Sequence, residues 1–477
     1  MMTVTDLLSD LRKRDVSLWL EGDRLRCSAP KNVLTAELQA ELARHKTEIL
    51  RSLRAARDRK ESAPLALERV PRTERMPLSF GQQRLWFLYQ MDPASTVYHI
   101  NDSLWLEKVD AAVLERTLEE LVRRHETLRT TFQVIDGEAA QVIGPPAPVS
   151  LLRVDLSGYD GPARQAEAQR LKAENSGQPF DLTVGPLFRF ALLDFGNQTF
   201  ELLVTQHHLI TDGWSIALLY TEMAQIYEAF AAGRPHRLPD LEIQYADYSH
   251  WQRRSLMGDV LAPQLDYWRD QLMGSTVLEI PTDHPRPAMQ SFRGALQLLA
   301  LSRQLSDGAV TAGREQGATL YMVLLAAFQI LLAKYSGQTD IVTGTSNGNR
   351  NRTELERIIG FFVNTQVLRV DFSGDPTLAE ALQRVASVAI DAYANQDVPF
   401  EKLVEELQPK RDLSRSPLFD VMFILQNTQL EKMNRAAKPD AAKTLTARER
   451  GGGASGFGTK VVTEGAGARL LVETGIS

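Results

Sequence analysis

The chain has 477 residues, of which 43% are hydrophobic and 24% are charged, and its formal net charge is -6. These values are typical of a globular, water-soluble protein, and no run of about eighteen apolar residues predicts a membrane span. No block of Lys and Arg indicates a nucleic-acid partner, and the length favours about three folding units.

The first 55 residues predict a small unit with the order helix, strand, strand, helix. Three leucines share one helical face over residues 3–14, and residues 16–29 alternate around a Gly22-Asp23 turn, as in a hairpin. Apolar residues at helical spacing then predict a helix over residues 35–53. A charged stretch, 56–75, follows and is typical of a linker.

Two further features of the N-terminal unit indicate where the protein is located and what its cysteine does. Acidic residues within the first ten positions are not typical of a secretory signal, so we expect a cytoplasmic protein. The single cysteine, Cys27, has no partner for an internal disulfide and lies in a predicted strand, which favours a small buried hydrophobe over a reactive thiol.

From residue 76 onward, helices and strands alternate, which indicates an α/β (α+β) fold. We expect a helix over residues 110–125, a hairpin over residues 187–208 that turns at Gly196-Asn197, and an amphipathic helix from Gly213.

Residues 250–429 show a mixture of helices and strands comparable to that of residues 76–249, although no residue-level repeat relates the two parts. Residues 430–477 have one aromatic residue and a Gly/Ser-rich centre, so we expect a disordered tail there.

The string HHLITDG, residues 207–213, is the strongest candidate for a chemical site. Neighbouring residues on a strand point to opposite faces, so only one of His207 and His208 can face a given cavity. Asp212 can hold the turn, and Gly213 leaves helix N-terminal amides accessible to an anion. The string predicts a general-base histidine. Two structural histidines or a metal site are the alternatives, although the spacing completes no zinc motif.

Six further segments share their order with one known family. They are SFGQQRLWFL (79–88), RHETLRTTF (124–132), YADYSHWQ (245–252), IGFFVNTQVLR (359–369), NQDVPFEKLVEEL (395–407) and RDLSRSPLFDVMFILQN (411–427). Together with HHLITDG they resemble the condensation domains of nonribosomal peptide synthetases. Residues 1–55 resemble the docking domains that precede some synthetase subunits.

The resemblance implies two chloramphenicol acetyltransferase-like lobes, 76–249 and 250–429, in a V-shaped pseudo-dimer. It implies amide formation, in which the amine of an acceptor aminoacyl carrier protein attacks the thioester of a donor carrier protein. The substrates arrive on the phosphopantetheine arms of these partners, and we expect no cofactor bound by the chain itself. The docking domain implies an upstream synthetase subunit as a further partner.

The resemblance also assigns roles to the residues of HHLITDG. It places His208 in the tunnel between the lobes, as a base or as an acceptor that positions the amine, and it assigns His207 to orientation. Asp212 is expected to bind an arginine, for which we name Arg286, and the Gly213 amide is expected to position or polarise the reacting groups.

The other motif residues favour supporting roles. Arg124 and Arg129 are expected to end a helix in solvent or in salt bridges, and Trp86, Trp251 and Phe361 are expected to be core aromatics. Asn364 is a further candidate for substrate or structural support.

The motif set is most similar to domains that accept an L-configured donor. Asn395 departs from the family, which commonly has His there, and the residues after Gln429 do not resemble the family's continuation. The second lobe is therefore expected to be incomplete. The alternative function is a truncated, inactive domain that acts only in docking.

Overall fold

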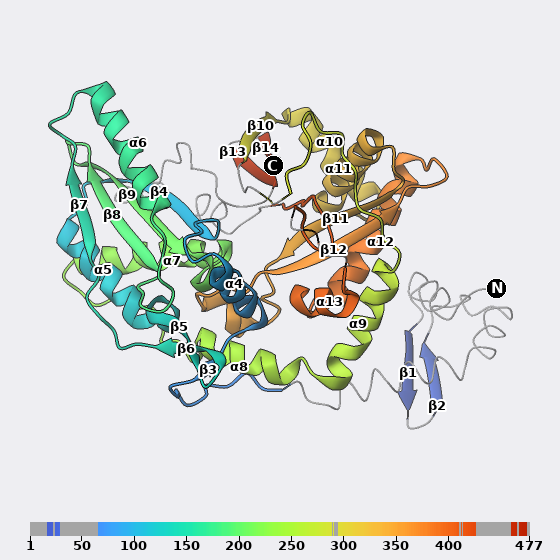
Figure 1. Ribbon diagram of the computed structural model, residues 1–477, viewed down its shortest axis with the longest axis horizontal. Helices are drawn as coiled ribbons and strands as arrows, with labels where there is room; N and C mark the ends of the chain where they lie inside the picture. The colour runs from blue at the N-terminus through green and yellow to red at the C-terminus, as the bar shows by residue number, and fades with distance from the viewer. Residues whose placement is uncertain are drawn as a thin grey trace. The chain divides into compact units, whose positions relative to one another are not determined.

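A computed structural model describes residues 17–21, 24–28, 65–288, 290, 294–409, 412, 414–425, 459–464 and 467–474. The chain forms two compact units, Met1–Ala66 and Leu67–Ser477. The boundary falls inside the stretch 56–75 that we predicted to be a linker. Figure 1 shows the elements of both units.

The N-terminal unit contains the predicted hairpin. Strands β1 (Ser17–Glu21) and β2 (Arg24–Ser28) are antiparallel, and Glu21 pairs with Arg24. Cys27 lies in β2, as predicted, opposite Leu18. The two helices predicted for this unit lie outside the described residues.

A four-stranded sheet forms the centre of the first lobe. Its order is β4 (His99–Glu107), β9 (Thr199–His207), β8 (Phe188–Asp194) and β7 (Leu151–Asp155), and only β7 and β8 are parallel. The predicted hairpin at Gly196-Asn197 joins β8 to β9 and is confirmed. A smaller sheet contains β3 (Met76–Pro77), β6 (Glu138–Ile143) and β5 (Thr130–Ile135).

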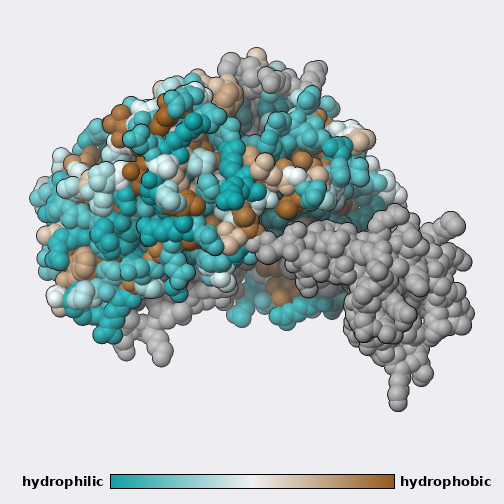
Figure 2. Space-filling view, turned by 90° about the horizontal axis from the view of Figure 1, so that it is seen from below, coloured by the Kyte–Doolittle hydropathy of each residue, from teal (hydrophilic) through white to brown (hydrophobic). Residues whose placement is uncertain are grey.

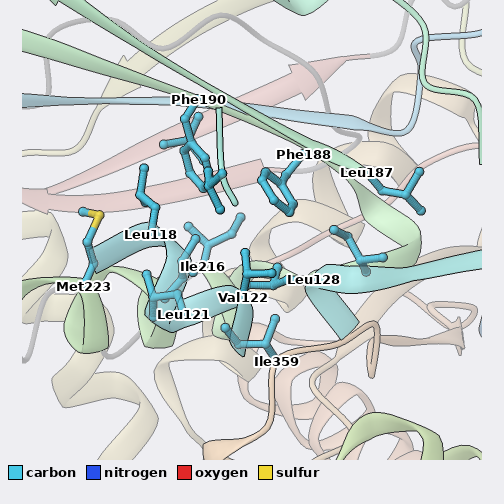
Figure 3. Packing of buried hydrophobic residues seen from close by; sticks show 14 of the residues in the cluster. Leu118, Leu121, Val122, Leu128, Leu187, Phe188, Phe190, Ile216, Met223 and Ile359 are labelled. Carbon is cyan, nitrogen blue, oxygen red and sulfur yellow. The ribbon is translucent and has the colours of Figure 1, made fainter. Parts of the chain in front are cut away.

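Helices cover both faces of the four-stranded sheet. Helices α5 (Ala111–Arg124) and α7 (Gly213–Ala231) share a hydrophobic core with β8 and β9. Figure 3 shows residues that α5, α7 and β8 contribute to it. Helix α6 (Gly161–Gly177) packs on the opposite face through Ala168 and Leu171. Because side chains alternate along a strand, Leu202 belongs to the first core and Leu203 to the second.

The second lobe follows two connecting helices, α8 (Tyr245–Ser255) and α9 (Gly258–Leu272). Strands β11 (Asp340–Asn347) and β12 (Asn364–Asp371) are antiparallel. Their core partners include α11 (Leu320–Ser336), α12 (Leu378–Ala394) and α13 (Phe400–Leu407). Helix α10 (Arg303–Glu315) precedes α11, and α4 (Phe80–Met91) of the first lobe contacts α13.

Two segments of the predicted disordered tail are strands in the structure. Strands β13 (Thr459–Glu464) and β14 (Gly467–Thr474) are antiparallel, and β14 pairs with β10 (Ala295–Ala300). The sequences KVVTE and RLLVET have the β-branched character of strands, which the composition of the whole 48-residue tail had concealed. The rest of that tail, from residue 430, lies outside the described residues.

Five residues between η3 (Thr353–Arg357) and β12, which we call the clasp (Ile358–Phe362), pack against the first lobe. Ile359 is buried in the core of α5 and α7 (Figure 3), a burial that contributes roughly 1.5–3 kcal/mol. Phe362 packs with Tyr245 and Tyr248 of α8. At Gly360, an added Cβ would lie 1.9 Å from the Tyr245 ring, so only glycine fits. The clasp therefore joins the second half of the chain to the first lobe.

The visible face in Figure 2 is mostly hydrophilic, and its hydrophobic residues lie in separate small groups. In the part of the chain that the structure describes, no single helix has both the length and the apolar character to cross a membrane. Helices α10 and α11, which are bent by 105° relative to each other, reach that length and apolar character only when they are taken together.

Two buried histidines face each other at one end of the central sheet. His99 of β4 pairs with His207 of β9, and their rings are 6.0 Å apart with Phe180 beside both. The Nδ1 atom of His207 accepts the Leu209 N–H at 3.1 Å. Burial, reinforced by the charges that His99 and His208 would carry, lowers the pKa of His207 from 6.5 to about 3. His207 is therefore neutral in the folded protein.

This lowered pKa predicts a loss of stability in acid. The unfolded chain binds a proton at His207 below pH 6.5, whereas the folded chain binds it only near pH 3. Above pH 6.5 the neutral His207 therefore causes no loss in the free energy of unfolding. Between pH 6.5 and about 3, that free energy falls by about 1.4 kcal/mol per pH unit. His207→Asn keeps an acceptor for the Leu209 amide but does not titrate. Urea unfolding at several pH values should show that the variant lacks this part of the acid sensitivity.

The exposed His284 provides a matched control, since His284→Asn should lose stability with pH as the wild type does. Parallel curves for the wild type and His207→Asn between pH 6.5 and 4 would contradict the prediction.

Candidate functional site

The predicted string HHLITDG lies where β9 ends and α7 begins. His207 is the last residue of β9, and His208 opens the short 3-10 helix η2 (His208–Ile210). Asp212 caps α7, because its side chain accepts the Ser215 N–H at 2.8 Å. The strand, the turn and the cap therefore set the positions of both histidines and of Asp212.

The His208 ring is held in one tautomer. Its Nδ1 atom lies 2.7 Å from the Thr211 carbonyl oxygen, which only accepts, so Nδ1 carries the proton. Nε2 then has a free lone pair. Burial lowers the pKa of His208 from its ordinary value, although the hydrogen bond to Thr211 and the negative charge of Asp212 act against this shift. His208 is a neutral imidazole, ready to accept a proton or a hydrogen bond at Nε2.

Asp212 is fully buried and connects α7 to the second half of the chain. One carboxylate oxygen accepts from Ser215 and lies 3.3 Å from Nη2 of Arg350. The other accepts the Phe362 N–H of the clasp at 3.0 Å. Several donors around one carboxylate compensate the cost of burying its charge.

The arginine beside Asp212 is Arg350, and the expectation that Arg286 takes this place is wrong. Arg286 lies 3.7 Å from Asp420 and donates to the Ser414 carbonyl at 3.3 Å. Arg350 follows β11, and its guanidinium lies 4.0 Å from the Phe362 ring. It also donates to Ser215 Oγ at 2.8 Å. The choice of Arg286 had rested on sequence alone, which does not show which loop folds back onto α7.

Gly213 is the first residue of α7, and its surroundings leave room for a ligand. A Cβ added there would meet no atom within 4 Å, and its backbone does not require glycine. Packing within the described chain therefore does not explain the glycine. The backbone at this exposed position is accessible from solvent.

Arg124 and Arg129 contact other parts of the first lobe. Arg124 is buried and donates to both oxygens of Glu222, at 3.0 and 3.1 Å. Burial alone would raise the pKa of Glu222, but the hydrogen bonds and charges of His125 and Arg124 hold it at about 2. Arg129 donates to the Gly144 carbonyl. Both arginines thus have hydrogen-bond partners in the first lobe. Of the two environments expected for Arg124, solvent is wrong and the salt bridge is found.

Trp251 and Asn364 have different surroundings. Trp251 is half-buried and packs beside Tyr248, with Arg352 over its ring. Asn364 donates to the carbonyls of Gln396 and Val398 and accepts the Phe400 N–H at 3.1 Å. These bonds tie β12 to the chain between α12 and α13, so Asn364 supports the second lobe.

Asn395 stands where the family commonly has His, and it ends α12 with its side chain on the Asp391 carbonyl at 2.8 Å. Its backbone carbonyl accepts from the Trp268 indole at 2.8 Å. Its described contacts thus lie within the second lobe, consistent with tolerance of this departure.

Sequence reasoning missed Arg350, Ser215 and Tyr245. Ser215 Oγ donates to the Gly360 carbonyl and accepts the Gly360 N–H, at 2.9 and 3.0 Å. The Tyr245 hydroxyl donates to the Phe361 carbonyl. Ser215 lies two residues after the motif HHLITDG, and Tyr245 is the first residue of the motif YADYSHWQ. Arg350 lies in the polar run SNGNRNR, residues 346–352. Among the described residues, no three His, Cys, Asp or Glu side chains gather to hold a metal ion.

Comparison with known proteins identifies two families along the chain. The model of the condensation domain matches residues 72–451, and that of the TubC N-terminal docking domain matches residues 4–54. The first match covers most of the chain.

Two curated relatives are synthetases. One of the linear gramicidin synthase subunits, from Brevibacillus parabrevis, is 49% identical over 369 residues, which are 77% of this chain and 7% of the relative. Phosphinothricin tripeptide synthetase PhsC of Streptomyces viridochromogenes is 38% identical over 419 residues, which are 84% of this chain and 39% of the relative. The chain thus spans only a small part of such relatives.

Solved structures show the same fold. The X-domain from teicoplanin biosynthesis has a TM-score of 0.75 at 30% identity, over 86% of this chain and 92% of that one. The first condensation domain of the calcium-dependent antibiotic synthetase, in complex with a substrate analogue, has a TM-score of 0.66 at 22% identity, over 84% and 91% of the two chains.

These findings confirm the predicted family and the mixed α/β fold class with chloramphenicol acetyltransferase-like lobes, and the family is one of amide-forming acyl transfer. The chain belongs to the condensation-domain family of nonribosomal peptide synthetases and carries a docking domain of the TubC type ahead of it.

Proposed function

We propose that this chain joins two carrier-bound substrates by amide formation and that His208 carries the proton transfer. The observation that carries the proposal is the His208 ring, whose Nδ1–H is bonded to the Thr211 carbonyl at 2.7 Å, so that Nε2 has a free lone pair. A neutral histidine in a fixed orientation is suited to act as a base or to position an amine.

The reaction needs one proton to move. The acceptor amine nitrogen attacks the carbonyl carbon of the donor thioester, a C–N bond forms, and negative charge develops on the carbonyl oxygen. Nε2 of His208 takes the proton that the amine loses. The C–S bond then breaks, and the departing phosphopantetheine sulfur receives a proton from the imidazolium. Burial disfavours a lasting imidazolium, which favours prompt return of the proton.

The neighbours of His208 have supporting roles in this proposal. His207, buried and neutral, orients the turn, and Asp212 holds the start of α7. The open space at Gly213, at the N-terminus of α7, suits the developing oxyanion or the reacting groups beside it. The donor and acceptor carrier proteins are the proposed partners, and an L-configured donor is the proposed substrate type.

An interaction module without chemistry is the alternative. The observation that favours it is the likeness to the teicoplanin X-domain, which has also been solved in a complex with OxyB. The assay that follows distinguishes the two functions, because a pure interaction module would transfer nothing.

The transfer assay uses two carrier proteins. A donor carrier loaded in turn with each proteinogenic L-amino acid is incubated with the chain and an aminoacyl acceptor carrier, and mass spectrometry of the intact acceptor detects the added residue. We expect transfer by the wild type and a loss of ~100-fold or more in His208→Ala. A donor of D configuration should react more slowly.

The exposed histidine serves as the control here as well, and His284→Ala should transfer at the wild-type rate. Equal rates for the wild type and His208→Ala would exclude the proposed base. Absence of transfer from every donor would favour the interaction module.

The docking domain is proposed to bind the C-terminal tail of an upstream synthetase subunit. The hairpin of β1 and β2 is two-stranded, so it offers strand edges to which an extended peptide can add. Calorimetric titration of the full chain with tail peptides of synthetase subunits should detect binding to one of them. A variant that combines Leu18→Asp, Leu20→Asp and Leu25→Asp should lose that binding. A peptide of the same composition in scrambled order should not bind the wild type. Retained binding in the Asp variant would exclude the hairpin as the site.

A further inference from the structure

Phe361 of the clasp packs against both the His208 ring and α4. The two ring centroids are 4.8 Å apart, and the rings are inclined at 67°. In α4, a Cβ added at Gly81 would lie 2.9 Å from Cε1 of Phe361, closer than carbon atoms approach. The absence of a side chain at Gly81 therefore creates the space that the Phe361 ring fills.

The backbone around Phe361 is fixed by first-lobe residues. The Tyr245 hydroxyl donates to the Phe361 carbonyl and, since it has one proton, accepts from Ser79 Oγ at 2.9 Å. Ser215 binds Gly360, and Asp212 binds the Phe362 amide. Three consecutive residues are thus held to the first lobe, and this fixes the backbone position from which the Phe361 ring reaches His208.

The Phe361 ring adds a second restraint on the orientation of the His208 imidazole. The hydrogen bond to Thr211 fixes the tautomer and selects one of the two preferred orientations about the Cβ–Cγ bond, but the torsional profile around that orientation is broad. A ring packed edge to face against the imidazole restricts this rotation. An error of about 1 Å in the position of a reacting group can reduce a rate ~100-fold.

We propose that Phe361 is a positioning residue for His208: it comes from the second half of the chain, occupies the space left by Gly81 and holds the imidazole so that Nε2 faces the substrates. The inference deepens the proposed function and rests on it. The clasp then has two roles, because it joins the second half of the chain to the first lobe and also orients the base.

A kinetic cycle on Phe361 and Gly81 tests the proposal with the carrier pair that the wild type accepts. Phe361→Leu should lower kcat ~10- to 100-fold while the KM for each carrier changes less than about two-fold. Gly81→Ala should also lower kcat, because the new methyl group displaces the Phe361 ring. Alanine favours a helix over glycine, so this substitution should not harm α4 itself. The double variant should be no slower than Phe361→Leu, since the methyl group then has no ring to displace.

Phe328 offers a matched control, because it is half-buried in the second lobe and packs on Phe423 at 5.5 Å. Phe328→Leu should keep the wild-type kcat. An unchanged kcat in Phe361→Leu, or multiplicative losses in the double variant, would overturn the proposal.

A spectroscopic measurement separates this inference from the proposed chemistry. In the full chain labelled with ¹³C at histidine Cε1, the His208 signal, assigned by its loss in His208→Ala, should be shifted by the Phe361 ring current. In Phe361→Leu it should move or broaden, whereas in Phe328→Leu it should stay. This result does not depend on transfer, so failure of the chemistry alone leaves it intact. An unmoved His208 signal in Phe361→Leu would overturn the positioning role.

Discussion

The buried carboxylate of Asp212 is the interaction on which the site depends. It caps α7, forms an ion pair with Arg350 and accepts a hydrogen bond from the Phe362 N–H. One carboxylate thus binds a helix of the first lobe and two segments of the second half of the chain. Removing either partner of a buried ion pair leaves the other charge uncompensated. The end of the turn that carries His208 is therefore stabilised by contacts with the second half of the chain.

The clasp extends this dependence from one charge to five residues. Ile359 enters the first-lobe core, Gly360 fits only because it has no side chain, and Phe361 reaches the His208 ring. The proposed base thus lies on one half of the chain, and Phe361, which contacts it, lies on the other.

Much of the fold and part of the site could be predicted from the sequence because they depend on local pattern. The hairpin at Gly196-Asn197 and the apolar stripe of α7 are short-range features, and the histidine string falls at a strand-to-helix turn that its residues favour. Arg350 could not be predicted, because it lies 138 residues beyond Asp212 and only the folded chain brings them together. The role of Phe361 was hidden for the same reason, since an aromatic residue in a motif usually packs in a core. Strands β13 and β14 were missed because composition was averaged over a long segment.

A double-mutant cycle on Asp212 and Arg350 tests the central claim most directly. The free energy of unfolding in urea is compared for the wild type, Asp212→Asn, Arg350→Gln and the double variant. The account predicts that each single variant loses about 3–5 kcal/mol and that the double variant loses clearly less than the sum, because it leaves no buried charge without its partner. Losses that add to within about 0.5 kcal/mol would contradict it, since the two halves of the chain would then not be coupled through Asp212.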